Sequence, residues 1–291
     1  MKIINIAVLL TCFNRKEKTL ACLDRLFSAH KTCSKAINLE VYLTDDGSTD
    51  GTEDAVKENY PQVKVLKGNG NLYWAGGMRN SWTSAKKDAY DFFFLLNDDT
   101  VLYSNVFNQF IEAHNKTMEA YNKGGIYVGA TEDPISKQNT YGGAVLLNKF
   151  AYKFKHLNPN GLLQKIDLGN ANIMFVSKNI VNKIGILSKD YIHGVADYDY
   201  TLRAVKKNLP VVLMAETCGS CVHDHADNYE KFPEKNFTER KKFLMHPLGL
   251  DFKSNFNFMK NHFPLRLPVI LFGAGLKLFF ARTYLKLSKA R

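Results

Sequence analysis

Two adjacent carboxylates, Asp98 and Asp99, follow Asn97 at the end of the apolar run Phe92 to Leu96. The run predicts a buried strand, so both acids would lie at its mouth, where an unpaired charge is costly. A divalent cation would offset that charge, because Mg²⁺ and Mn²⁺ prefer oxygen ligands and take the remaining ones from substrate phosphates and water. The alternative is a solvated turn or a helix N-cap.

A second acidic cluster runs from Asp45 to Thr52 and reads Asp-Asp-Gly-Ser-Thr-Asp-Gly-Thr. It follows the apolar run Leu39 to Leu43, so its carboxylates would stand at a strand end, before a tight turn and a capped helix. A carboxylate fixed there can accept hydrogen bonds from a ribose hydroxyl or a base N–H group. A plain Asp-Gly turn with an N-cap is the alternative.

Further segments also carry reactive or recognition side chains. Trp74 lies in the polar, glycine-rich stretch Gly68 to Asn80, where its indole could stack on a sugar ring or be a core aromatic. The segment Cys218 to His225 is dense in Cys and His, but no second Cys/His pair stands at zinc-finger spacing, which disfavours a zinc site. Asp199 and Arg203 have the spacing of a helix-surface ion pair.

The elements between these clusters must bring them together. Apolar runs rich in β-branched or aromatic residues predict strands, and helix-like segments alternate with them, as in βαβ units around a mostly parallel sheet. The predicted strands are 3–10, 39–43 and 92–96, and the predicted helices are 15–29, 52–58 and 103–121. Ligands of open α/β sheets bind beyond the carboxyl ends of the strands, so the polar clusters should meet in one crevice.

Together with the turn Thr11-Cys12-Phe13-Asn14-Arg15, these elements resemble the family 2 inverting glycosyltransferases with the GT-A fold, over roughly residues 3–227. The resemblance implies an α/β fold with a mostly parallel central sheet flanked by helices, divided into a nucleotide-binding half and an acceptor half. In that family the two strand-end turns hold the nucleoside, and the glycine-rich segment closes over the nucleotide-sugar. The residues expected to bind the nucleotide-sugar are Thr11, Asn14, Arg15, Asp46, Trp74, Gly76, Gly77 and Arg79.

The metal site is also expected from this resemblance. The family's Asp-x-Asp motif corresponds to Asn97-Asp98-Asp99, where Asn replaces the first acid. The match implies Asp99 as the ligand of Mn²⁺ or Mg²⁺, and Asp98 as a second ligand or a ribose contact. Family members often carry a further metal-binding His at a later strand end, which implies His223 here, with His225 as the alternative.

The segment Ala196 to Arg203 resembles the family's Glu-Asp-x-Asp-x-x-x-Arg motif, although Ala196 stands where the customary Glu would be. The second acid of that motif deprotonates the acceptor hydroxyl. The resemblance therefore implies Asp197 as the general base.

The positive charge of the chain is concentrated at its C-terminal end. The formal net charge is +11, and residues from Lys231 onward contain 13 Lys and Arg against 3 Asp and Glu. No RNA-binding motif accompanies this charge, so nucleic acid is not expected as a partner. The apolar run Val269 to Leu276, and a following helix-like segment with apolar and basic faces, predict an interfacial membrane helix. Packing of this helix on the domain is the alternative.

We therefore expect a catalytic domain over residues 1–230 and a basic helical extension over residues 231–291. Five cysteines, an odd number, without a recognisable signal peptide indicate the cytoplasm, here its membrane face.

The resemblance, which is strongest to bacterial rhamnosyltransferases and other capsule or O-antigen transferases, implies inverting sugar transfer in cell-surface polysaccharide or glycolipid biosynthesis. The expected donor is a UDP-, dTDP- or GDP-sugar, and the expected acceptor is a glycan or a lipid-linked acceptor. One rival is a nucleotidyltransferase, whose glycine-rich signature is missing from residues 11–15. The other is an inactive glycan-binding protein, suggested by Asn97 and Ala196.

Overall fold

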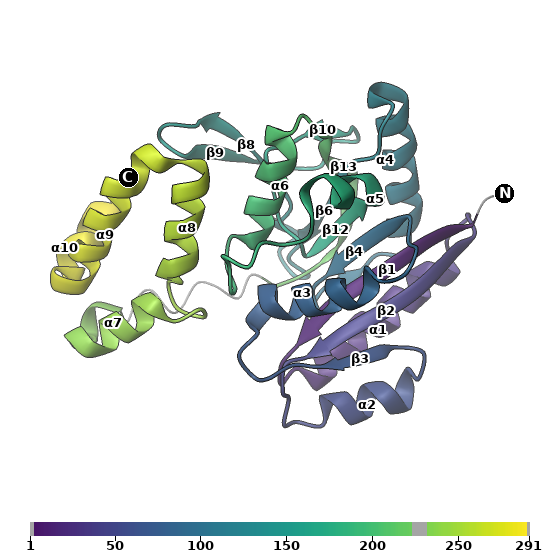
Figure 1. Cartoon of the computed structure of the whole chain (residues 1–291), viewed down its shortest axis with the longest axis horizontal. Coiled ribbons are helices and arrows are strands. Elements are labelled where there is room, and N and C mark those ends of the chain that lie inside the picture. Colours follow the sequence, from purple (N-terminus) through teal and green to yellow (C-terminus); the bar gives the residue numbers. More distant parts are fainter. Residues whose placement is uncertain (1–2, 223–231, 290–291) are drawn as a thin grey trace.

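The computed structural model describes residues 3–222 and 232–289 (Figure 1). A mixed, mostly parallel sheet crosses residues 3–222, which are called the catalytic part after the domain expected from the sequence, with the strand order β10-β13-β6-β12-β4-β1-β2-β3. Helices cover both faces of this sheet, and four further helices form a C-terminal group at one side of it. The α/β fold class expected from the sequence is therefore confirmed.

Parallel strands form the first half of the sheet. β1 (Ile4–Cys12) pairs with β2 (Ile37–Asp45) on one side and with β4 (Phe92–Leu96) on the other, and β3 (Lys64–Lys67) extends the sheet beyond β2. All three predicted strands are confirmed. β1 and β2 each run two residues further than predicted, so both reach into the polar clusters at their ends.

One antiparallel strand interrupts this order. β12 (Ile173–Ser177) lies between β4 and β6 (Ile126–Glu132) and runs against both, while β13 (Val211–Ser220) is parallel to β6. Because β12 runs in the opposite sense, its first residues stand at the same edge as the carboxyl ends of β1, β2 and β4. The chain just before β12, residues 170–172, thus joins the polar clusters.

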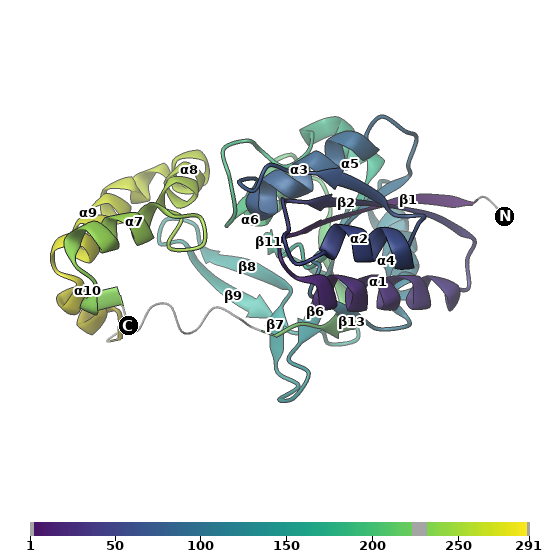
Figure 2. The same cartoon turned by 90° about the horizontal axis from the view of Figure 1, so that it is seen from below.

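The two faces of the sheet have separate cores. On one face α1 (Lys16–Lys31), α2 (Thr52–Asn59) and α4 (Val106–Tyr121) pack against the even-numbered residues of β1 from Ile6 to Leu10. On the other face lie α3 (Tyr73–Ala85), α5 (Lys178–Ile184) and α6 (Ala196–Lys206), which share a buried cluster with Ala7 and Leu9. Figure 2 shows the two helix layers on opposite sides of the sheet. Three of these six helices, α1, α2 and α4, were predicted, with boundaries shifted by up to three residues.

Short strands complete the catalytic part. A second sheet contains β8 (Gly143–Asn148) between β9 (Lys153–Leu157) and β11 (Leu168–Gly169). The remaining strands of the main sheet are β5 (Val101–Leu102), β7 (Asn139–Tyr141) and β10 (Gln164–Lys165).

The C-terminal group consists of α7 (Phe237–Met245), α8 (Phe252–His262), α9 (Leu267–Phe279) and α10 (Ala281–Lys289). Its helices differ in how they contact the catalytic part. Phe258, Met259 and Phe263 of α8 and its C-terminal end share a buried cluster with Tyr191 and Ala196, so α8 is packed onto the catalytic part. None of the described helices is long and apolar enough to span a membrane.

Candidate active site

The site is built where the ends of β1, β2 and β4 meet the start of β12. The backbone N–H of Asp46 donates to the carbonyl of Cys12 at 3.0 Å, and the N–H of Asn97 donates to the carbonyl of Asn172 at 3.2 Å. The first bond joins the turns after β1 and β2, and the second joins the turn after β4 to the segment before β12. The strand-end clusters that were predicted to meet therefore lie on adjacent backbone segments at one edge of the sheet.

Arg15, at the start of α1, pairs with both acids that follow β4. Its Nη1 lies 2.7 Å from Asp99 Oδ2 and 3.3 Å from Asp98 Oδ1. Asp98 is buried, and Thr19 Oγ1 also donates to its carboxylate. Burial raises the pKa of Asp98 to about 7, although the charge of Arg15 acts in the opposite direction. The acids at the buried end of β4 are therefore paired with a positive charge, which comes from the guanidinium of Arg15.

This arrangement also fits a divalent cation. Two carboxylates at the sheet edge are the usual protein share of a Mg²⁺ or Mn²⁺ shell, with phosphates and water supplying the rest. Arg15 stands in for that cation, and its side chain is 41% exposed, so it can leave the acids without disturbing a core. Within residues 3–222 and 232–289, no cluster of three or more His, Cys, Asp or Glu could hold a metal. His223 and His225 lie outside the described residues.

Both carboxylate oxygens of Asp46 accept hydrogen bonds from backbone N–H groups of the protein. Its Oδ1 accepts the backbone N–H groups of Asn69 and Gly70 at 3.2 and 2.9 Å. Its Oδ2 accepts those of Leu72 and Tyr73 at 2.8 and 2.9 Å. Asp46 therefore holds the glycine-rich loop at the entry to α3, and its predicted contact with a nucleoside stays a prediction.

The turn after β1 is locked to the turn after β2 through Asn14. Its Oδ1 accepts the backbone N–H of Thr49 at 2.7 Å, and its own N–H donates to Ser48 Oγ at 2.9 Å. Asn14 has a positive φ of 50°, a conformation that Asn tolerates better than most residues. Asn14 thus joins two of the three strand-end turns.

The start of α3 approaches β1 closely because Gly77 has no side chain. A Cβ atom at Gly77 would lie 2.0 Å from Thr11 Oγ1, and one at Gly76 would lie 3.1 Å from Leu72 Cβ. Both glycines are therefore explained by packing. Their predicted contact with a nucleotide-sugar, like that of Thr11, stays a prediction.

Trp74 and Arg79, both on α3, have protein partners. The indole Nε1 of Trp74 donates to Asn97 Oδ1 at 2.7 Å, so the Asn that replaces the first acid of the family motif accepts this hydrogen bond. Arg79 Nη1 donates to the carbonyls of Ser188 and Tyr191, both at 2.8 Å, and thereby holds the loop before α6. Binding of a nucleotide-sugar by these two side chains stays a prediction.

Asp197 lies in the first turn of α6, next to the segment that leads into β12. Its Oδ2 accepts the N–H of Ala171 at 3.2 Å and Asn170 Nδ2 at 3.5 Å, and its Oδ1 accepts the N–H of Tyr198 at 2.8 Å. Burial raises the pKa of Asp197, and these hydrogen bonds oppose the shift. The segment from Asn170 to Asn172 therefore links the predicted base to the turn that carries Asp98 and Asp99.

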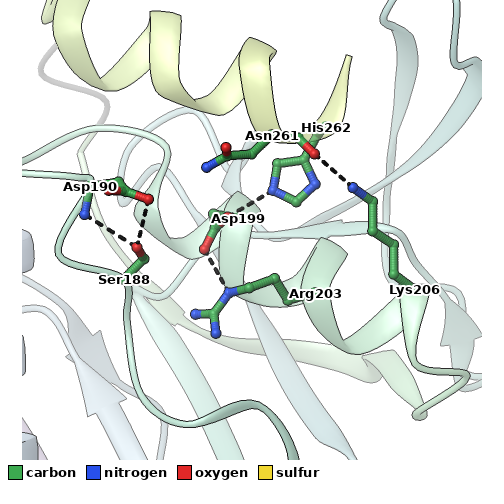
Figure 3. Close-up of a pocket in the computed structure, with 7 residues that line it drawn as sticks. All are labelled: Ser188, Asp190, Asp199, Arg203, Lys206, Asn261 and His262. Carbon is green, nitrogen blue, oxygen red and sulfur yellow. Dashed lines mark hydrogen bonds and ion pairs between the residues drawn. The ribbon is translucent and has the colours of Figure 1, made fainter. Parts of the chain in front are cut away.

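The predicted ion pair between Asp199 and Arg203 is confirmed, but its expected place on the helix surface is wrong. Arg203 Nε lies 2.8 Å from Asp199 Oδ2, and Asp199 is buried. The reason is α8, whose His262 Nε2 lies 2.7 Å from Asp199 Oδ1 (Figure 3). Burial would raise the pKa of Asp199, but His262 and Arg203 outweigh it and hold the pKa below its ordinary value.

Sequence reasoning missed several residues of this edge. Asn170 contacts Asp197, and Asn172 Nδ2 lies 3.6 Å from Cys221 Sγ, which is itself 3.7 Å from Asp99 Oδ1. The two amides in the run Gly-Asn-Ala-Asn before a strand were the available signal. They were not singled out because the strand was not predicted.

A mixed, mostly parallel α/β sheet with this helix arrangement is the fold of GT-A glycosyltransferases. The family model described as "Glycosyl transferase family 2" matches residues 7–182, more than half of the chain, and the chain belongs to that family.

Solved structures support the fold. A mannosyltransferase from Pyrobaculum calidifontis, solved with GDP-Man and Mn²⁺, is 14% identical with a TM-score of 0.52, over 98% of this chain and 75% of that one. TarS from S. aureus, residues 1–349, is 13% identical with a TM-score of 0.51, over 94% and 79% of the two chains. No curated protein sequence matches the chain.

Proposed function

We propose that this glycosyltransferase moves a sugar from a nucleotide-diphosphate sugar to an acceptor hydroxyl with inversion, with Asp197 as general base. One observation carries the proposal. Asp197 and the acid pair Asp98 and Asp99 stand at the same sheet edge, linked through residues 170–172 by hydrogen bonds to Ala171 and Asn172. An acceptor and a donor diphosphate can thus be held next to each other.

The base acts on the acceptor hydroxyl. The O–H bond breaks as its proton passes to a carboxylate oxygen of Asp197, and the acceptor oxygen forms a bond to the anomeric carbon. The bond from that carbon to the phosphate oxygen breaks on the opposite face, and its electron pair leaves with the nucleoside diphosphate. Because burial raises the pKa of Asp197, its carboxylate takes a proton more readily than an exposed one.

The leaving group develops charge on the side of Asp98 and Asp99. A Mn²⁺ or Mg²⁺ ion bound there, with His223 as the proposed further ligand, would offset charge on the departing diphosphate. Arg15 has one positive charge beside these acids and a partly exposed side chain, so it is suited to contact a phosphate oxygen. Asp46 supports the donor site by holding the loop that leads into Trp74.

The mannosyltransferase with the similar fold was solved with GDP-Man and Mn²⁺. For this chain we propose a UDP-, dTDP- or GDP-sugar donor, and a glycan or lipid-linked acceptor of cell-surface polysaccharide or glycolipid biosynthesis. The proposed domains are a catalytic domain of residues 1–230 and a basic extension of residues 231–291. The proposed location is the cytoplasm, with peripheral contact to the cytoplasmic face of the membrane through the extension.

The first experiment identifies the donor. UDP-, dTDP- and GDP-sugars are screened by thermal shift with Mn²⁺, since a ligand at about 100 times its Kd adds about 2.7 kcal/mol of stability. Release of the nucleoside diphosphate is then measured with Mn²⁺ or Mg²⁺. If no common nucleotide-sugar binds and none is hydrolysed or transferred, the proposed enzyme activity is wrong.

The second experiment tests the base. Asp197→Asn should abolish transfer and leave donor affinity nearly unchanged, because the amide keeps the size of the side chain but cannot take the proton. Asp190→Asn is the matched control, since Asp190 is an exposed acid on the loop before α6, and it should retain transfer. Equal loss of transfer and donor binding in Asp197→Asn would make Asp197 a structural residue.

A further inference from the structure

Helix α9 buries none of its residues, although its sequence, Leu-Pro-Val-Ile-Leu-Phe-Gly-Ala-Gly-Leu-Lys-Leu-Phe, is almost entirely apolar. Val269 is 51% exposed, Phe272 70% and Phe279 64%. Helices of soluble proteins normally turn such a stripe toward the core, because burial of one large apolar side chain stabilises by about 1.5 to 3 kcal/mol. The outward stripe of α9 therefore indicates a surface that is covered in use.

The large exposed side chains of α9, apart from Leu271, share one face. Val269, Phe272, Leu276 and Phe279 are spaced by three, four and three residues, which places them along one side of a helix. Leu276 in the same row is partly buried. We call this row the α9 stripe.

The catalytic part contributes a second apolar element beside the start of α9. Phe150, at the tip of the β8–β9 hairpin, is 77% exposed, and Leu265, just before α9, is also exposed. Arg266 Nη1 donates to the carbonyl of Ala151 at 2.6 Å, so the hairpin tip and the start of α9 are in direct contact. Figure 1 shows the hairpin reaching over the C-terminal group at this point. The apolar surface therefore joins both parts of the chain.

The charge around this surface is predominantly positive, although Glu239 lies on α7, which packs beside α9. Residues 252–291 contain eight Lys and Arg and no Asp or Glu, and Lys149 and Lys153 flank the hairpin tip. Two copies of the chain would bring like charges together at such a surface, which disfavours self-association. An anionic lipid leaflet matches both features, since apolar side chains enter the acyl boundary and each basic residue gains from the surface potential.

We propose that the α9 stripe and the tip of the β8–β9 hairpin dock together onto an anionic lipid bilayer, with α9 lying in the plane of the interface. This inference rests on the peripheral membrane contact proposed above and names its surface. It differs from a free amphipathic tail, because the hairpin belongs to the catalytic part and α8 is packed onto it. The docked surface would therefore fix the orientation of the active site toward the membrane.

The test is sedimentation of the full chain with vesicles of phosphatidylglycerol and phosphatidylcholine in equal amounts, and with vesicles of phosphatidylcholine alone. Wild-type protein should bind the anionic vesicles and lose affinity at high salt. Phe272→Glu and Phe150→Glu should each weaken binding by roughly tenfold or more, since each removes a large apolar side chain from the interface. Ile135→Glu is the matched control, because Ile135 is highly exposed on the β6–β7 turn, and it should bind as wild type does.

Retention of nucleoside diphosphate binding by each variant shows that it is folded and separates this inference from the proposed activity. If wild type transfers sugar but ignores anionic vesicles, or if Phe272→Glu binds them unchanged, the docking surface is wrong and the proposed transferase stands. If Phe150→Glu alone is neutral, the hairpin has no part in docking. Concentration-dependent dimerisation that Phe272→Glu abolishes would instead assign the stripe to a second copy.

Discussion

Arg15 and Asp46 both make hydrogen bonds inside the protein, although the family resemblance assigns both to the nucleotide-sugar. Arg15 neutralises Asp98 and Asp99, and Asp46 satisfies backbone donors of a loop. The two contacts differ in how easily they break. The Arg15 side chain is partly exposed, whereas the Asp46 carboxylate is buried and has four partners. Arg15 can therefore exchange partners more easily than Asp46 can.

This difference gives a prediction for metal binding. Arg15 and a divalent cation compete for the same carboxylates, so Arg15→Met should raise the affinity for Mn²⁺ measured without nucleotide. A half-exposed ion pair contributes about 1 kcal/mol or less, which limits the gain to roughly fivefold. Titration followed by electron paramagnetic resonance measures it, with Arg25→Met, an exposed position on α1, as control. An unchanged or lower affinity would exclude competition by Arg15.

Asp46 gives a prediction for loop order. Asp46→Asn replaces one acceptor oxygen by an N–H donor, so two backbone N–H groups of residues 69–73 lose their partner. The expected loss is about 2 to 4 kcal/mol in the free energy of unfolding in urea. Amide hydrogen exchange of residues 69–73 should accelerate beyond that of Asp133→Asn, a control in an exposed turn. Unchanged exchange with lost nucleotide binding would instead indicate direct nucleoside contact.

The raised pKa of Asp197 gives a prediction for pH. The base must be ionised to take a proton, so transfer should fall on acidification at a higher pH than expected for an exposed carboxylate. The same burial means that the folded state binds this proton more tightly than the unfolded state. The ionised carboxylate therefore destabilises the fold at neutral pH, and the penalty disappears as the pH falls and Asp197 is protonated.

Asp197→Asn removes this ionised form but also one acceptor oxygen, so its free energy of unfolding relative to wild type should be highest at neutral pH and fall in acid. Urea unfolding at several pH values checks the stability, and the pH profile of kcat/KM checks the rate. A difference in stability that does not depend on pH would mean that Asp197 is not ionised in the folded protein.

At the scale of elements, α3 packs closely against β1 where Gly77 meets Thr11, and this contact leaves no room for a Cβ atom. Gly77→Ala would place its Cβ against Thr11, so strand and helix must separate. The expected cost is about 1 to 3 kcal/mol in the free energy of unfolding, as for other overpacked contacts. Weaker donor affinity should accompany it, because Trp74 and the 68–72 loop shift with the helix.

Gly275→Ala, in α9, is the matched control. A Cβ atom there meets nothing within 4 Å, so replacing Gly by Ala should stabilise the helix by about 1 kcal/mol. Chemical denaturation of both variants measures the difference. A Gly77→Ala protein as stable as wild type would show that the α3–β1 contact relaxes without cost.

At the scale of the whole molecule, α8 is the part of the C-terminal group that belongs to the catalytic fold. His262 reaches Asp199 on α6, two residues after the proposed base, and Asp251 Oδ2 accepts the N–H of Gly194 at 3.1 Å. Both ends of α8 are thus bound to the segment that carries Asp197. The C-terminal group therefore positions the helix of the proposed base through α8, while α9 and α10 extend away from it (Figure 2).

His262→Ala should loosen this attachment. The substitution leaves a cavity and removes a hydrogen bond to a buried carboxylate, which together cost about 2 to 4 kcal/mol in the free energy of unfolding. Limited proteolysis should then cut between α6 and α9 faster than in wild type. Asn257→Ala, which loses a surface hydrogen bond to the Asp190 carbonyl, is the control and should stay within about 0.5 kcal/mol. Equal effects of both variants would mean that His262 does not hold α8.

The sequence alone determined the α/β class, the three strands that end in polar clusters and the acids at those ends. These features are local, because an apolar run or a turn can be recognised from a few consecutive residues of the sequence. The strands β6, β12 and β13 were not predicted. β6 and β13 each follow a helix, but short apolar runs cannot be distinguished from buried helix segments by periodicity alone. Asn170 and Asn172 were missed with them.

Only the tertiary structure decided the partner of each charge. Arg15 and Asp98 are 83 residues apart, and His262 and Asp199 are 63 apart, so no local pattern connects them. Asp46 was predicted to bind the nucleoside, and its hydrogen bonds to the loop were not foreseen, because these partners follow 23 to 27 residues later. A buried charge takes whichever partner the fold brings within hydrogen-bond distance, and that distance exists only once the sheet and its helices are packed.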